Sequence, residues 1–78
     1  MAITIAAATA IKALAPGVAS TGPVSIPGLQ TGDFVLRVIP DGFTSGFEDV
    51  ISVNDQIQQL SNLDWSSVTL TFYLLRGV

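Results

Sequence analysis

The chain's capacity for acid–base chemistry rests on six carboxylates, because its 78 residues include no histidine and no cysteine. Two carboxylates at a suitable separation can act as the acid and base of glycoside hydrolysis. Most of these acids, however, stand in turn-like sequence beside Gly, Asn or Ser, where carboxylates commonly accept hydrogen bonds from nearby backbone amides. We therefore interpret the six as turn residues and expect no enzymatic activity: Asp33, Asp41, Glu48, Asp49, Asp55 and Asp64.

Other ligand-binding patterns are weak. The chain has seven glycines but neither GxGxxG nor GxxxxGK[ST], so phosphate cradles are not indicated. Glu48, Asp49 and Asp55 do not have calcium-loop spacing and favour a solvated loop, although an ion at a symmetric interface stays open. Trp65 and Tyr73 suggest a sugar-stacking platform, but a single tryptophan more often belongs to a core or an interface. We expect no cofactor.

Short extended segments must position these side chains. Residues 34–39 and 68–75 alternate as strands do, and we interpret 24–26 and 50–53 as shorter strands. Pro27-Gly28 between them has the chemistry of a type II turn. Residues 54–63 fit a helical turn or a corner between sheets. The pattern predicts an all-β fold, a small β-sandwich or open, jelly-roll-like barrel.

The two long strands are apolar on both faces, which predicts packing within the chain on one face and between chains on the other. In 34–39, Phe34, Leu36 and Val38 are expected to oppose a face that contains Arg37. We expect Arg37 to pair with a carboxylate or reach solvent, since an unpaired buried charge is costly. The three glutamines at 56, 58 and 59 are expected to be exposed or used between chains.

Residues 1–15 are ambiguous between a short alanine-rich helix and a strand. Thr4, Thr9 and three isoleucines dilute the helix preference, so we favour an extended N-terminal arm or edge strand over 1–15 and a single β domain over 16–78. No basic residue precedes the first apolar run and Lys12 interrupts it, so neither a cleaved signal nor a membrane-spanning helix is expected.

Composition points to association with other chains. Hydrophobic residues make up 49% and charged residues 12%, about half the usual charged share of roughly 25%. So little charge on so short a chain favours burial of surface against neighbours. The net charge of −3, with only three basic residues, argues against binding nucleic acid or a membrane surface.

One stretch resembles small virion structural proteins of tailed bacteriophages. Val24-Ser25-Ile26-Pro27-Gly28-Leu29-Gln30-Thr31-Gly32-Asp33-Phe34-Val35-Leu36 has their IPGL-x-x-GD turn before a strand, and the later segments ISVNDQIQQLS and VTLTFYLLRG are also similar to theirs. The resemblance covers residues 22–78. It implies a β-sandwich subunit, often a homotrimer, that decorates a capsid as a cement protein or forms part of a head or tail fibre.

This resemblance sets the functional expectations. The chain is expected in the virion, assembled in the host cytoplasm, with copies of itself and the major capsid protein or another virion protein as partners. A carbohydrate-binding module, or a fibre or tail module, is the alternative. The residues expected at interfaces are Ile3, Ile5, Ile11, Leu14, Trp65, Tyr73 and Leu75.

Overall fold

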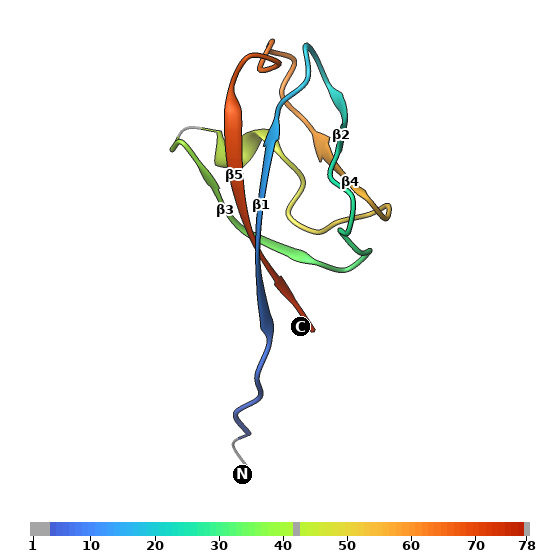
Figure 1. Cartoon of the computed structure of the whole chain (residues 1–78), viewed down its shortest axis with the longest axis vertical. Helices are drawn as coiled ribbons and strands as arrows, with labels where there is room; N and C mark the ends of the chain where they lie inside the picture. Colours follow the sequence, from blue (N-terminus) through green and yellow to red (C-terminus); the bar gives the residue numbers. More distant parts are fainter. Residues whose placement is uncertain (1–3, 42, 78) are drawn as a thin grey trace.

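The computed structural model describes residues 4–41 and 43–77, which form two antiparallel sheets and one short 3-10 helix (Figure 1). The larger sheet has the strand order β1-β5-β3, and the smaller one pairs β2 with β4. The two sheets are not closed into a barrel. The all-β prediction is confirmed. The elements are β1 (Thr9–Pro16), β2 (Gly22–Ser25), β3 (Phe34–Ile39), η1 (Thr44–Gly46), β4 (Gln56–Gln59) and β5 (Thr69–Arg76).

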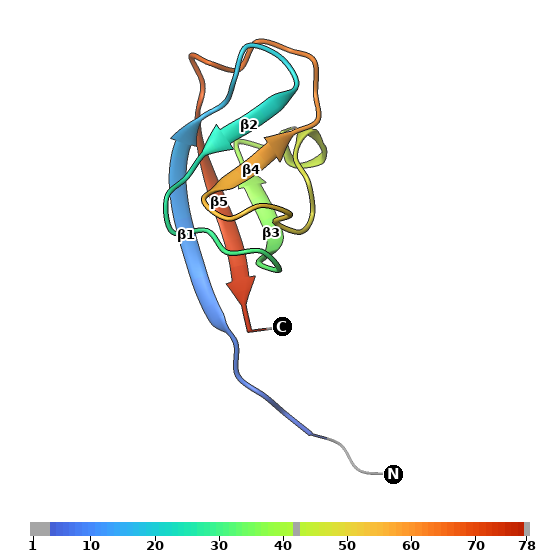
Figure 2. The ribbon, with the colours of Figure 1, turned by 90° about the vertical axis from the view of Figure 1, so that its right-hand side faces the viewer.

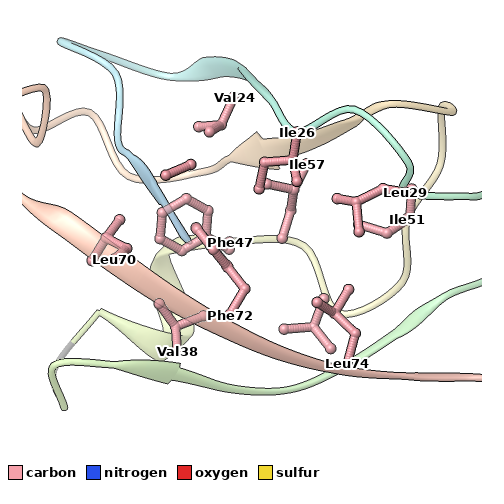
Figure 3. Close-up of a cluster of buried hydrophobic side chains, with 12 residues drawn as sticks. Val24, Ile26, Leu29, Val38, Phe47, Ile51, Ile57, Leu70, Phe72 and Leu74 are labelled. Atoms are coloured by element: carbon pink, nitrogen blue, oxygen red, sulfur yellow. The ribbon is translucent and has the colours of Figure 1, made fainter. Parts of the chain in front are cut away.

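The hydrophobic core lies between the two sheets (Figures 2 and 3). The large sheet contributes alternate residues of β5, two residues of β3 and one residue of β1, and β2 and β4 cover them. Loop residues between the strands fill the remaining volume. The buried hydrophobic residues are Ala15, Val24, Ile26, Leu29, Val35, Val38, Phe47, Ile51, Ile57, Leu70, Phe72 and Leu74.

Strand β5 is the centre of the large sheet and follows the predicted alternation. Leu70, Phe72 and Leu74 are buried, whereas the residues between them face the other side and are half-buried. A strand with neighbours on both edges has its backbone hydrogen bonds satisfied along its length. Its apolar side chains are therefore determined by packing alone.

Strand β3 has the predicted bounds, but its predicted faces are wrong. The pairing of β3 with β5 shifts register between Val35 and Arg37, which is a β-bulge. The bulge places Val35 and Val38 on the core side and leaves Phe34 and Leu36 exposed. An extra residue in one strand breaks the period of two, so a simple alternation cannot describe this strand.

The predicted strand at 50–53 is also wrong. Around it, Phe34 bridges Val50 and Phe47 bridges Gln59, but no continuous ladder forms. Backbone hydrogen bonds from residues 46–51 reach both sheets. Val35 N donates to Asp49 O at 2.7 Å, and Glu48 N donates to Gln58 O at 3.1 Å. The segment therefore connects the sheets instead of adding a strand to one of them.

The segment predicted as a helical turn or corner contains β4, which pairs with β2 in the register Val24 to Ile57. The turn predicted at Pro27-Gly28 is present. Leu29 N donates to Ile26 O at 3.3 Å. Gly28 has φ 101°, a conformation that glycine adopts without strain.

At the N-terminal end the structure shows an edge strand from Thr9 onward. β1 pairs with β5 from Thr9–Arg76 to Pro16–Thr69, which overrides the helix preference of its alanines. Residues 4–8 belong to no helix or strand, are all exposed, and run away from the body (Figures 1 and 2).

Candidate interaction surface

The side of the β1-β5-β3 sheet that faces away from the core is here called the outer face. Cross-strand partners on a sheet share a face, and the pairing registers arrange this one in three rows. Each row crosses β1, β5 and β3 in turn. The rows are Leu14–Thr71–Ile39, Lys12–Tyr73–Arg37 and Ala10–Leu75–Phe34.

The two flanking rows expose large apolar side chains. Leu14 is 61% exposed, Phe34 is 40% exposed and Ile39 is 38% exposed. Leu36, the extra residue at the bulge, is 50% exposed beside them. Large apolar side chains exposed together on one face are typical of a protein–protein contact.

The central row places two cationic side chains on either side of a tyrosine. Tyr73 is the cross-strand partner of both Lys12 and Arg37. Arg37 Nη2 also donates to Asp41 Oδ1 at 2.7 Å, which confirms the expected carboxylate partner. This hydrogen bond, and the charge of Asp41, raise the pKa of Arg37. The outer face therefore combines apolar contact area with the charge of Lys12 and the Arg37–Asp41 ion pair.

Three of the predicted interface residues share this face, namely Leu14, Tyr73 and Leu75. Ile5 stands apart on the N-terminal segment, where it is 96% exposed. Ile11 points to the other side of β1, is half-buried and packs against the core. Ile3 lies outside the described residues.

Trp65 also lies on the core side and is half-buried. Its ring meets Phe43 edge-on with centroids 4.6 Å apart, and Phe47 at 5.6 Å. Phe47 in turn contacts Phe72 of β5 at 5.0 Å. Because Tyr73 faces the opposite side of β5, Trp65 and Tyr73 do not form a joint sugar-stacking platform.

The acidic side chains mostly hold local or long-range backbone in place. Asp55 Oδ1 accepts from Gly28 N at 2.8 Å, and Glu48 Oε1 accepts from Gln58 N at 3.2 Å. Asp33 accepts from the nearby Gln30 amide, as expected of a turn residue, but it is also buried and pairs with Arg76. Within residues 4–41 and 43–77 there is no group of three or more acidic side chains that would hold a metal ion.

Gln59 was expected to be exposed or used between chains, and the structure corrects this. Its side chain is fully buried and its amide serves the chain itself. Val18 N donates to Oε1 at 2.9 Å. The Nε2 group lies 2.9–3.3 Å from four carbonyl oxygens, those of Val18, Ser20, Ser61 and Leu63.

Several residues of the outer face were not predicted as interface residues from the sequence, chiefly Lys12, Phe34 and Ile39. Strand periodicity shows which residues share a face of one strand. It does not show which strands are neighbours or how they are aligned. The apolar residues on both faces of 34–39 were the available signal, and the bulge concealed which of them reach the surface.

Comparison of the chain with protein-family models, curated proteins and solved structures finds no significant match. No helix in the described part of the chain has the length and hydropathy needed to span a membrane.

Proposed function

We propose that this chain is a structural subunit of a bacteriophage virion, in its most specific form a capsid decoration (cement) protein. The observation that carries the proposal is the outer face, where exposed Leu14, Phe34 and Ile39 surround a cationic row on a small two-sheet body. The resemblance of residues 22–78 to virion proteins supplies the setting, and the role is non-catalytic.

The proposed mechanism is mechanical. Copies of the chain contact one another and the major capsid protein or another virion protein. Each contact buries apolar area of the outer face. The free energy gained is about 25 cal/mol for each Å² of apolar surface removed from water. A lattice repeats the contact many times, so modest single affinities add up to a stable shell. Binding also favours the folded subunit by mass action.

Purified particles provide the direct test. Tailed particles from the host that makes this chain are banded on a density gradient and their proteins are quantified by mass spectrometry. The proposal expects the chain in the capsid band at a copy number comparable with that of the major capsid protein. Absence of the chain from intact particles overturns the proposal.

Surface variants then locate the contact. Leu14→Asp and Ile39→Asp place a charge in one apolar row and are expected to weaken binding to particles stripped of the chain by about tenfold or more each. Leu63→Asp is the matched control, because Leu63 is 57% exposed but lies outside the outer face. Thermal melts of all three verify folding. Equal loss for the control and the test variants would remove the outer face from the mechanism.

A further inference from the structure

The edge of the large sheet at β1 is open to another strand. The order β1-β5-β3 pairs β1 with β5 alone within that sheet. Natural edge strands are usually blunted by bulges, charges, proline or short length. β1 runs for eight residues in one unbroken register with β5, its single charged residue is Lys12, and its proline stands at its last position.

The segment before β1, residues 4–8, is exposed and would be stabilised by pairing with another strand. Residues 4–8 continue from the start of β1, past the level at which β5 ends opposite Thr9 (Figure 1). All five are exposed, and among the described residues Ile5 has the most exposed large hydrophobic side chain. An extended apolar segment of this kind gains by pairing its backbone and covering its side chains.

We propose that residues 4–8 add as a strand to the free edge of β1 in a second copy of this chain, and that the exchange is reciprocal. The open edge and the segment belong to one continuous strand. An antiparallel pair about a two-fold axis therefore covers both segments and the first half of both β1 edges at once. An in-register parallel pair would also cover both segments, but it would place Lys12 beside Lys12 of the second copy, and like charges in that position oppose pairing.

The side-chain pattern selects the register. Ile11, Ala13 and Ala15 point to the core side of β1. With the axis perpendicular to the sheet, the two cores lie on one side, so facing residues must both be odd or both be even. Ala8 opposite Ala8 of the second copy meets this condition and places Ile5 opposite the half-buried Ile11.

The same register brings no like charges together. Lys12 faces Thr4 of the second copy, Ala6 faces Ala10, and Ala7 faces Thr9. Small side chains along the ladder allow close approach, and directly opposed like charges, which oppose pairing, do not occur. This exchange does not depend on the virion proposal. It differs from the trimer that the family resemblance implies.

The absence of cysteine from the chain allows a clean cross-linking test. Directly opposed residues of antiparallel strands lie within the Cα separation that a disulfide spans. Full-length Ala8→Cys is expected to form a covalent dimer under mild oxidation at least tenfold faster than Ala19→Cys. Ala19 is an exposed residue in the loop between β1 and β2 and serves as the control. Equal rates overturn the proposal.

Light scattering provides a second test of the exchange. The native chain is expected at twice its 8.1 kDa mass at micromolar concentration. Ala6→Pro and Ile5→Asp each disturb the segment outside the body and are expected to weaken the dimer at least tenfold while the circular dichroism and Trp65 fluorescence stay unchanged. A monomeric or trimeric native chain overturns the exchange and leaves the virion proposal to its own particle test.

Discussion

Arg76 donates to both carboxylate oxygens of Asp33, with Nε 3.0 Å from Oδ1 and Nη2 2.8 Å from Oδ2. Nη2 also lies 2.8 Å from Gly28 O, and Gln30 N donates to Asp33 Oδ2 at 2.9 Å. The Asp33 side chain is 2% exposed, whereas that of Arg76 is 34% exposed. The pair connects the end of β5 to the loop between β2 and β3.

Asp33→Asn is expected to lower the free energy of unfolding by about 1–2 kcal/mol. The change removes the charge from a buried hydrogen-bonded group, and the partial exposure of Arg76 moderates the loss. Asp41→Asn is the matched control, since the Arg37–Asp41 pair is exposed on both sides and is expected to contribute little. Urea unfolding measures both. Equal changes would mean that the buried position of Asp33 has no special role.

Acid is expected to destabilise the native chain through the same residue. Hydrogen bonds from Arg76, and secondarily from the Gln30 backbone, hold the pKa of Asp33 below its ordinary value of 3.8. The contribution of ionised Asp33 is therefore complete above about pH 4 and is lost as the pH falls through the lower pKa of the folded state.

The measurement is the melting temperature between neutral pH and strong acid. It should fall below about pH 4 more steeply in the native chain than in Asp33→Asn. Some slope should remain in the variant, because hydrogen bonds from Ser66 also lower the pKa of Asp64. Parallel curves for the two proteins would contradict the assignment.

Gln59→Met is expected to lower the free energy of unfolding by about 2–3 kcal/mol, because methionine fills the volume but leaves buried backbone groups without their partner. The amide of Val18, which donates to Gln59 Oε1, should exchange its hydrogen faster. Gln58→Met, at the half-buried neighbour in β4, is the control. Undiminished protection of Val18 in Gln59→Met would show that other groups hold this loop.

Gly46→Ala is expected to cost about 1–3 kcal/mol. A Cβ at this position would collide with Cη2 and Cζ3 of Trp65. Trp65→Phe removes those ring atoms, so the double variant should lose at least about 0.5 kcal/mol less than the sum of the single variants. Ser45→Ala, at an exposed position of η1, is the control. Strict additivity would contradict the contact.

The strands with strong periodicity could be predicted from the sequence. Segment 68–75 predicted β5 to within one residue at each end, and 34–39 predicted β3 at its observed bounds. β4 was missed because three of its four residues are glutamine, and a buried glutamine such as Gln59 has no signature until its partners are known. Val50 and Ile51 suggested a strand because they are apolar, although only isolated bridges form there.

The candidate surface was harder to predict than the fold. Leu14, Tyr73 and Leu75 were named from the sequence, but the rows they form depend on strand order and register. These are contacts between residues distant in the chain. Asp33 shows the same limit, because its partner Arg76 lies 43 residues away. From the local pattern alone it was interpreted as a turn residue, like the other acids.

The single extra residue in β3 has a wider consequence for how this chain can change. The bulge takes one apolar residue from each alternating set, Val35 and Val38, into the interior and leaves Phe34, Leu36 and Ile39 outside. The apolar character of that surface therefore depends on the register of β3 and not on its composition. Substitutions would tune it one side chain at a time, whereas deletion of Leu36, the extra residue, would remove the bulge and keep Val35 and Val38 inside in an unbroken ladder with β5.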